Sequence, residues 1–362
     1  MRQLLYILIG CIAFTACSKD DGTEETPAIS RTIIVYMAAD NDLSGDALID
    51  LEEMKQGFME TDVNLVVFSD LPGELPRIMK ISPESATEVH TYPEFNSTEP
   101  SQMRQILNNI ISMYPADEYG LILWSHGTSW LPAGVRLKSF GEDAGKQMDI
   151  QALAEALPIR FDFILFDACL MGSVEVAYEL KYKTDYLIAS STETVYEGFP
   201  YDLIVPELLK PDINSMLIAE TYFNYYNSLP GAYCSATVSV TDCKELERLA
   251  ELTRQLLSGG TYDLSVFDRT AVQRLDVYSE QYTFDFLDFI NKLLPYADKS
   301  LFIRQLDRTV LYKANTRRFL EEYDIETYCG LSCYIPHPNR DDLNEYYKTL
   351  GWYAVSGFNF LF

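Results

Sequence analysis

The chain has 362 residues, with 54 acidic and 28 basic side chains, so its formal net charge is −26. Such a polyanion repels phosphate backbones and anionic headgroups, which argues against nucleic-acid binding through a basic face. Hydrophobic residues make up 48% of the chain, which excludes global disorder and provides material for a large core.

The N-terminal segment has the pattern of a targeting signal. Arg2 precedes the apolar stretch LLYILIGCIAF, which is too short to span a bilayer, and Phe14-Thr15-Ala16-Cys17 follows. Because this sequence resembles a bacterial lipobox, we expect residues 1–16 to be a lipoprotein signal peptide and Cys17 to carry lipid. An ordinary secretory signal is the alternative.

Residues 17–30 are polar and acidic and have no apolar periodicity, as expected of a solvated tether. The acidic residues just after the cysteine also resemble a surface-export signal of Bacteroidetes lipoproteins. We therefore expect an exported, lipid-anchored protein at the outer membrane or cell surface of a Gram-negative bacterium. Its only membrane contact would be this N-terminal anchor.

The cysteines and histidines do not form a recognisable metal or disulfide pattern. Beyond Cys17, the mature chain carries five scattered cysteines, at positions 169, 234, 243, 329 and 333. This is too few for a disulfide scaffold in a chain of this length. Neither a CxxC pair, nor HExxH, nor a Walker A or GxGxxG sequence occurs, so we expect no metal and no cofactor.

From Arg31 onward, short apolar runs alternate with helical patterns. Strands are predicted at 31–37, 65–68, 120–124, 161–166 and 186–189, a hairpin at 77–82 with 88–92, and helices at 43–57, 103–113, 150–157 and 173–180. Repeated βα units with fully apolar strands predict an α/β fold. Its sheet would be mostly parallel, with helices on both faces.

The second half of the chain is less regular. Strands are predicted at 235–240 and 328–335, and helices at 244–257, 284–294 and 301–311. Since no Pro/Gly/Ser-rich linker interrupts the chain, we expect one domain over residues 31–362. Its core would span about 31–240, with a C-terminal extension over about 241–362 packed on it.

Residues with reactive side chains follow two of the predicted strands. His126 and Gly127 come just after the strand 120–124, and Cys169 comes just after the strand 161–166. Ligands of open parallel sheets bind beyond the carboxyl ends of the strands, and βαβ crossovers bring those ends to one edge. His126 and Cys169 are therefore expected to face one cleft.

These residue types suit attack by a thiol on a carbonyl group. Cys169 needs a base to become a thiolate, and His126 is the only histidine at such a strand end. The start of the following helix also favours an anionic sulfur. Gly127 has no side chain, so its N–H can approach a developing oxyanion. A lone buried cysteine or a capping histidine remains the alternative for each residue alone.

Three longer stretches carry a family resemblance. The sequences RTIIVYMAADNDL, YGLILWSHGTSW and FDFILFDACLMGSVEVAYELKYKTDYLIASSTE resemble the clostripain family of cysteine peptidases, peptidase family C11, which is related to the caspase, gingipain and legumain groups. The resemblance implies a caspase-like α/β fold and endopeptidase action through a Cys/His dyad without an obligatory third member. It implies His126 as general acid/base, Cys169 as nucleophile, and Gly127 with the Cys169 N–H as the oxyanion site.

The family typically cleaves after a basic residue, usually Arg. Asp167 matches the family's acidic residue two positions before the nucleophile, although a turn or cap role is the alternative. The segment containing Glu193, Thr194 and Glu197 is expected to line the same edge and bind substrate. Here Val195-Tyr196 departs from the family's S-x-E-x-E-P-G pattern, which leaves the preference for a basic residue open.

Members of this family are often processed between the two catalytic strands, after a basic residue. Residues 131–147 contain glycine and lack strong periodicity, so we expect a flexible loop over the cleft. Arg136, Lys138 and Lys146 are the candidate cleavage sites. An ordinary surface loop is the alternative.

Two other functions compete with a self-processed peptidase. An α/β-hydrolase would need a G-x-S-x-G or G-x-C-x-G elbow, and neither occurs. A non-catalytic surface-exposed binding lipoprotein with the same fold is the second. For the peptidase we expect a peptide or protein substrate, no nucleic-acid partner, and a monomer.

Overall fold

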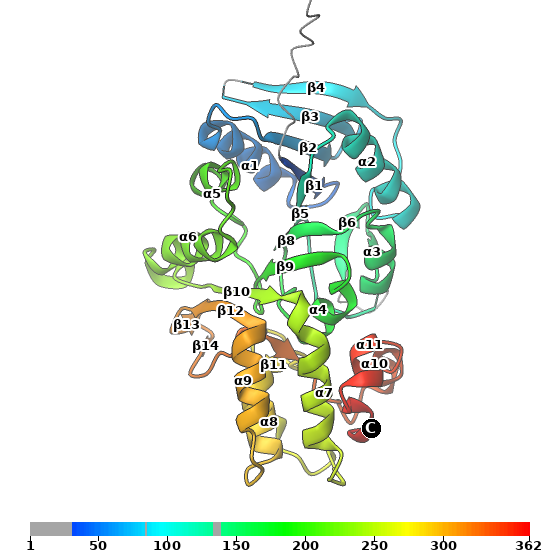
Figure 1. Cartoon of the computed structure of the whole chain (residues 1–362), viewed down its shortest axis with the longest axis vertical. Coiled ribbons are helices and arrows are strands. Elements are labelled where there is room, and N and C mark those ends of the chain that lie inside the picture. Colours follow the sequence, from blue (N-terminus) through cyan, green and yellow to red (C-terminus); the bar gives the residue numbers. More distant parts are fainter. Residues whose placement is uncertain (1–30, 84, 133–138) are drawn as a thin grey trace, which may run out of the picture.

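The computed structural model describes residues 31–83, 85–132 and 139–362 (Figure 1). The expected signal peptide and tether, including Cys17, and the candidate cleavage sites Arg136 and Lys138 lie outside the described residues. None of the helices in the described ranges is both long and apolar enough to cross a membrane.

A nine-stranded sheet forms the centre of the molecule, in the order β12-β10-β9-β8-β5-β1-β2-β3-β4. The five central strands are parallel, and two antiparallel strands extend each edge. The central strands are β1 (Arg31–Ala38), β2 (Asn64–Asp70), β5 (Glu118–Trp124), β8 (Phe161–Asp167) and β9 (Thr184–Ala189). The edge strands are β3 (Arg77–Ser82), β4 (Ser85–Thr91), β10 (Thr237–Asp242) and β12 (Val310–Asn315).

Helices cover both faces of this sheet. One face packs against α2 (Pro100–Met113), α3 (Ile150–Ala156) and α4 (Val174–Leu180), and the other against α1 (Ser44–Gly57), α5 (Tyr201–Leu208) and α6 (Ser215–Asn227). Successive strand residues point to opposite faces, so Val35 and Tyr36 of β1 enter different cores. The predicted α/β, caspase-like class with helices on both faces is confirmed.

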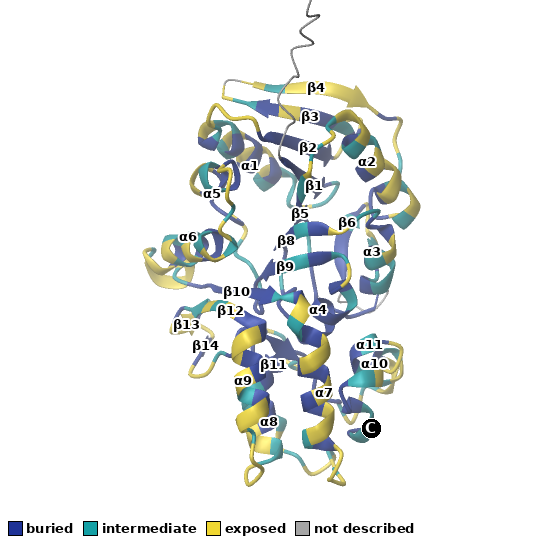
Figure 2. Ribbon diagram, in the orientation of Figure 1, coloured by how far each residue is buried: buried dark blue, intermediate teal, exposed yellow. Residues whose placement is uncertain are grey.

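The C-terminal part packs on the sheet edge and on α4. It contains α7 (Leu246–Leu257), α8 (Phe286–Leu293), α9 (Ser300–Thr309), α10 (Asp341–Tyr347) and α11 (Gly351–Val355). In Figure 1, α7 and α9 run side by side beyond β12. The ring of Trp352 in α11 lies 5.7 Å from that of Tyr178 in α4. Figure 2 shows exposed residues on α7 and α9 and buried residues along the sheet.

Several predicted elements of the second half were wrong. The apolar run 328–335 forms a strand only at β15 (Ser332–Cys333), which pairs with β11 (Phe284–Asp285). The end of the predicted helix 301–311 is the start of β12, and short strands β13 (Arg318–Phe319) and β14 (Tyr323–Asp324) follow. The periodicity of a short apolar run does not show whether the run is a strand or another kind of buried segment. Here most of the run is an irregular segment that is buried in the core.

The segment after His126 also differs from expectation where the structure describes it. Instead of a flexible loop up to residue 147, β6 (Phe140–Asp143) and β7 (Lys146–Met148) form a hairpin. Phe140 forms a β-bridge with Gly127, and the Gly141 N–H donates to the His126 carbonyl at 2.9 Å. This pairing orders the hairpin against the carboxyl end of β5.

Candidate active site

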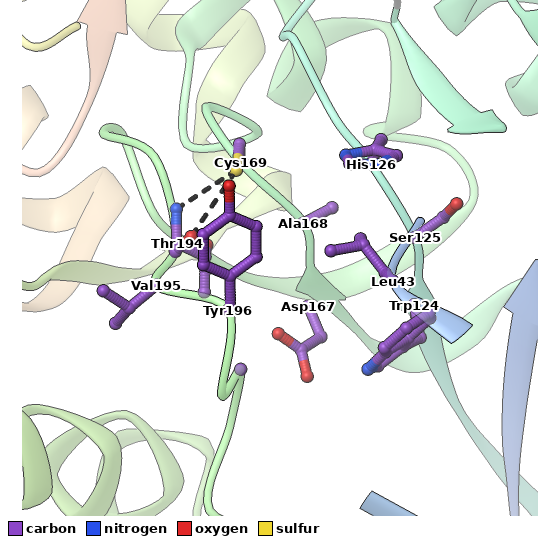
Figure 3. Close-up of a pocket in the computed structure, with 11 residues that line it drawn as sticks. Leu43, Trp124, Ser125, His126, Asp167, Ala168, Cys169, Thr194, Val195 and Tyr196 are labelled. Atoms are coloured by element: carbon purple, nitrogen blue, oxygen red, sulfur yellow. Dashed lines mark hydrogen bonds between the residues drawn. The ribbon is translucent and has the colours of Figure 1, made fainter. Parts of the chain in front are cut away.

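The carboxyl ends of β5 and β8 bring the predicted catalytic residues together. Trp124, the last residue of β5, lies opposite Asp167, the last of β8, in a parallel pair. His126 and Cys169 each follow two positions later, and both line one small cavity of about 60 Å³ (Figure 3). The cavity is also lined by Leu43, Ser125, Ala168, Thr194, Val195, Tyr196 and Gly198.

Cys169 sits in a tight turn between β8 and α4. The next residue, Leu170, has a left-handed φ of 65° and donates its N–H to the Thr192 carbonyl at 2.8 Å. A non-glycine residue in this region is strained and persists only where its surroundings fix it. The turn thus presents the thiol at the end of the strand in a defined position.

The thiol of Cys169 is hydrogen-bonded to the backbone of Thr194. The Thr194 N–H donates to Sγ at 3.2 Å, and the thiol donates to the Thr194 carbonyl oxygen at 3.7 Å (Figure 3). Burial raises the pKa of Cys169 to about 12, although the Thr194 N–H opposes this, and the Glu193 and Asp167 carboxylates add to it. The free enzyme therefore holds a protonated thiol at neutral pH.

His126 contacts a carboxylate in the described structure, and not the thiol. Its Nε2 lies 2.7 Å from Oδ1 of Asp42, in the turn between β1 and α1. The preceding Ser125 fixes this strand end by donating Oγ–H to the Ala38 carbonyl at 2.6 Å. Catalytic hydrogen bonds are often long or absent before substrate binds, so this geometry does not argue against a Cys/His pair.

Gly127 lies directly against the backbone of Cys169. A Cβ atom at this position would come within 2.6 Å of the Cys169 carbonyl oxygen and 2.9 Å of Ala168 Cβ. Only glycine fits this close approach. Gly127, His126 and Cys169 share a second hollow of about 560 Å³ with Asp42, Thr128, Glu142 and Tyr278.

Asp167 belongs to a buried acidic group beside the small cavity. Its Oδ2 accepts hydrogen bonds from the Phe199 N–H at 3.1 Å and the Tyr201 hydroxyl at 3.0 Å. Burial raises its pKa to about 6, despite these two hydrogen bonds. Asp50 and Glu53 of α1 lie behind it, and Glu53 accepts from the Tyr201 N–H at 3.0 Å. None of the residues lining this cavity in the described structure is a lysine or arginine.

The other predicted substrate-binding residues lie in different places. Thr194 lines the small cavity and holds the thiol, whereas Glu197 is exposed next to Gly198. Glu193 is turned away toward the C-terminal part, where it accepts from the Val277 N–H at 3.0 Å. Val195 and Tyr196, which interrupt the family pattern, are themselves part of the cavity lining.

A loop of the C-terminal part, residues 276–283, closes the far side of the site. It carries Tyr278 into the hollow beside Cys169. The buried carboxylate of Asp276 organises the loop by accepting backbone N–H groups of Tyr278, Tyr282 and Thr283 at 2.6–3.0 Å. Sequence patterns gave no signal for this contribution, because the contact joins segments more than a hundred residues apart.

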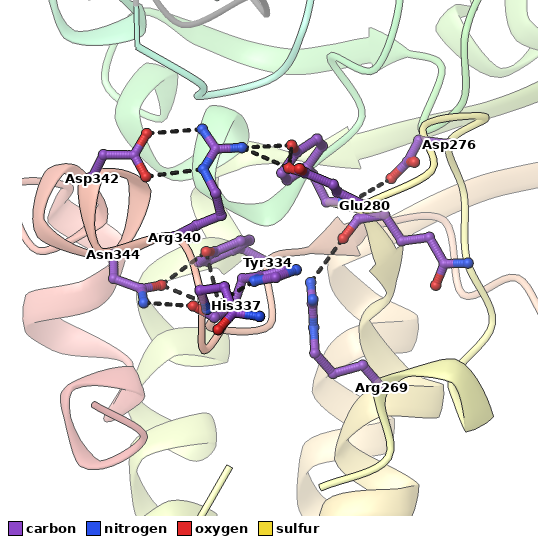
Figure 4. Close-up of polar contacts among 11 residues, drawn as sticks. Arg269, Asp276, Glu280, Tyr334, His337, Arg340, Asp342 and Asn344 are labelled. Atoms are coloured by element: carbon purple, nitrogen blue, oxygen red, sulfur yellow. Dashed lines mark hydrogen bonds and ion pairs between the residues drawn. The ribbon is translucent and has the colours of Figure 1, made fainter. Parts of the chain in front are cut away.

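An arginine clamps the outside of this loop (Figure 4). Arg340 binds both carboxylate oxygens of Asp342 at 2.8 and 2.9 Å. It also donates to Glu280 at 2.7 Å and to the Tyr282 hydroxyl at 2.6 Å. Arg269 donates to the Gln281 carbonyl at 2.7 Å. The C-terminal extension therefore positions one wall of the candidate active site.

A model of the clostripain family, peptidase family C11, matches residues 35–354, which include both strand ends of the site. The chain belongs to the clostripain family. It is thus a member of a family of cysteine-type endopeptidases, as its sequence motifs predicted. The match spans most of the described residues, from β1 to α11.

Similar proteins and solved structures agree with this family assignment. The chain is 28% identical to clostripain of Hathewaya histolytica over 244 residues, which cover 52% of this chain but only 45% of that relative. It is similar to the solved inactive zymogen of a C11 protease from Parabacteroides distasonis, with 33% identity, TM-score 0.80, and coverage of 90% of this chain and 97% of that one.

A second solved structure is similar over the same extent. It is a secreted C11 cysteine protease from Bacteroides thetaiotaomicron in complex with an irreversible peptide inhibitor. The identity is 29% and the TM-score 0.81, with coverage of 91% of this chain and 99% of that one. These clostripain-family structures share both the sheet and the C-terminal part with the present chain.

Proposed function

We propose that this clostripain-family chain hydrolyses peptide bonds with Cys169 as nucleophile and His126 as general acid and base. The observation that carries the proposal is that Cys169, His126 and Asp167 line one cavity at adjacent strand ends. The Bacteroides thetaiotaomicron relative solved with an irreversible peptide inhibitor supports a peptide as the ligand.

The reaction follows from the chemistry of these groups. Substrate binding brings the imidazole of His126 to the thiol, and the S–H proton passes to the ring as sulfur attacks the carbonyl carbon. The N–H groups of Gly127 and Cys169 stabilise the oxyanion. His126 then gives the proton to the departing amine, which leaves a thioester on Cys169. Water hydrolyses the thioester with His126 as base, and the thiol is regenerated.

The residue before the scissile bond is proposed to be Lys or Arg. Asp167 lines the cavity, and the carboxyl groups of Asp50 and Glu53 lie close behind it. A cationic side chain would neutralise the charge of Asp167 through hydrogen bonds that are stronger than those between neutral groups. Thr194 is proposed to contact the substrate from the cavity wall, and Glu197 from the rim.

Three variants of the full chain test the catalytic assignment. Cys169→Ala and His126→Ala should each abolish hydrolysis of peptides with Lys or Arg before the scissile bond, with little further loss in the double variant. Cys234→Ala, which changes another partly exposed cysteine, is the control and should keep wild-type turnover. Retention of activity in Cys169→Ala would exclude this mechanism, and an inactive wild type that still binds peptides would favour the non-catalytic binding lipoprotein.

We further propose that the protein is exported and anchored through lipid on Cys17. The Bacteroides thetaiotaomicron relative is described as secreted, which supports export. Two or more acyl chains would make anchoring stable, whereas one chain would be marginal. Cys17→Ala should move the protein from the membrane fraction to the soluble fraction, and mass spectrometry of the wild type should find lipid on residue 17.

Self-processing next to the catalytic histidine is the last part of the proposal. The Parabacteroides distasonis relative is described as an inactive zymogen, which supports a precursor stage in such chains. Arg136, Lys138 and Lys146 remain the candidate sites. Lys146 is exposed but lies in β7, so cleavage after it requires the hairpin to open.

A further inference from the structure

Asp42 makes the only described hydrogen bond to the imidazole of His126, with 2.7 Å between Oδ1 and Nε2. The two residues come from neighbouring parallel strands, because Asp42 follows β1 and His126 follows β5. Both line the same hollow as Cys169. The carboxylate of Asp42 therefore contacts Nε2, the ring nitrogen farther from the backbone.

The turn that carries Asp42 is fixed by its neighbour Asn41. The Asn41 side-chain amide donates to the Ala38 carbonyl at 3.0 Å and to the Glu142 carbonyl at 2.8 Å. Its oxygen accepts from the Leu43 N–H at 2.9 Å. The turn is therefore attached both to β1 and to the hairpin that follows the histidine. Asp42 is held at a defined place relative to the ring.

We infer that Asp42 is a positioning residue for His126, which makes Nδ1 the atom that receives the thiol proton. This inference rests on the proposed catalytic pair. An ionised carboxylate only accepts hydrogen bonds, so Nε2 must carry a hydrogen. In the neutral imidazole the lone pair is then on Nδ1. The S–H bond of Cys169 breaks as an N–H bond forms at Nδ1, and the imidazolium formed keeps its Nε2–H on Asp42.

The exposure of the two side chains determines how much Asp42 contributes to catalysis. The side chain of Asp42 is 83% exposed and that of His126 is 30% exposed, so water screens their attraction. Asp42 should therefore assist catalysis without being obligatory. We expect its loss to lower kcat by roughly two- to fivefold, with KM unchanged. A buried carboxylate that supported the Cys/His pair would be expected to contribute far more to kcat.

Activity measurements test the inference with Asp42→Asn and Asp42→Ala. Asp62→Asn is the control, because it removes the same charge from an exposed position before β2, at the amino ends of the parallel strands. Both Asp42 variants should lower kcat and shift the acid limb of the pH profile to lower pH, since the imidazolium loses its anionic partner and the neutral ring that acts as base forms at lower pH. An unchanged kcat and an unchanged acid limb in both variants would overturn the inference.

A second measurement does not depend on activity. In the Cys169→Ala background, nitrogen NMR of the His126 ring reports which nitrogen carries the hydrogen. The chain has only 3 histidines, so replacing each one assigns its signals. The ring should be the Nε2–H form with Asp42 present and a mixture in Asp42→Ala. A ring protonated on Nδ1 in both would overturn the inference. A wild-type chain without peptidase activity, together with an Nε2–H ring, would instead contradict the proposed function and leave this inference standing.

Discussion

Trp124 of β5 donates its indole N–H to Asp50 of α1, with 2.6 Å between Nε1 and Oδ2. Asp50 is almost completely buried, and this burial, together with the charge of Asp167, raises its pKa to about 9. At neutral pH this site therefore holds a protonated carboxyl group. The pairing places a second acidic group behind the cavity wall formed by the indole.

Replacement of Asp50 by Asn should stabilise the protein at alkaline pH. The folded pKa of about 9 lies above the ordinary 3.8, so the folded state retains a proton that the unfolded chain loses. The stability from this group is complete below the lower pKa and is lost as the pH rises toward the upper one. Asn cannot ionise, and its oxygen can still accept from Trp124.

Thermal unfolding at two pH values checks this prediction. In the Cys169→Ala background, which prevents self-digestion, Asp50→Asn should raise Tm by roughly 2–4 °C at pH 8. At pH 4 it should leave Tm unchanged. An equal loss of stability at both pH values would mean that the carboxyl group contributes through a contact that Asn cannot replace.

Asp167→Asn should weaken cleavage after Lys and Arg more than cleavage after neutral residues. The amide can retain the hydrogen bonds from Phe199 and Tyr201 but offers no charge to a cation. Removal of one charged hydrogen bond costs a factor of roughly 10–100 in kcat/KM. Asp62→Asn, at an exposed position before β2 and away from the site, is the control for a change of net charge.

The raised pKa of Asp167 also predicts that cleavage of basic substrates depends on pH. Burial raises the pKa of Asp167 to about 6, so the group is neutral below that pH and anionic above it. For basic substrates, kcat/KM should therefore rise as the pH passes through about 6, and Asp167→Asn should remove this step. A step that persists unchanged in the variant would have to come from another group.

The sequence was sufficient to predict the parallel centre of the sheet and the meeting of two strand ends. Fully apolar strands in βα units leave few alternatives, and the rule for carboxyl ends brings His126 and Cys169 to one edge. The C-terminal part does not consist of regular βα units, so this rule does not apply to it. The apolar run 328–335 is buried in the core, but it contributes only two residues to a strand.

The residues that surround the catalytic pair could not be predicted. Asp42 and Asp50 lie in a turn and a helix whose direction relative to the sheet depends on tertiary packing. Glu193 was expected to face the substrate, but its carboxylate binds the backbone of Val277. Cys169 and His126 were expected to face one cleft, and both line it, but the hydrogen bond from the Thr194 N–H to the thiol was not foreseen. Such contacts depend on distances that spacing in the sequence does not determine.

Arg340→Ala should raise KM with little change in kcat. Arg340 joins Asp342 to the loop 276–283 through Glu280, and that loop carries Tyr278 into the hollow beside Cys169. Without the clamp the loop loses several hydrogen bonds, and substrate binding must order it, at a cost of roughly three- to tenfold in affinity.

Two further variants make this measurement specific. Lys348→Ala removes a cation from the same part of the chain, where Lys348 forms an ion pair with Glu345 and lies over the ring of Phe362, and it should leave KM unchanged. Arg340→Lys should restore KM only partly, because an ammonium group cannot bind Asp342 through two parallel hydrogen bonds. A lower kcat with an unchanged KM would show that the loop does not contact the substrate.

Self-cleavage should depend on Cys169 and respond unequally to the three candidate sites. Lys146 lies in β7, where Asp143 is its partner across the hairpin, and a protease must bind its substrate as an unpaired extended chain. Lys146→Gln should therefore change processing less than Arg136→Gln and Lys138→Gln together. Gel analysis and N-terminal sequencing of the fragments check this, with Cys169→Ala as the uncleaved control. Cleavage that continues in Cys169→Ala would show that another protease cuts the chain, and a fully active but intact wild type would show that activation does not require cleavage.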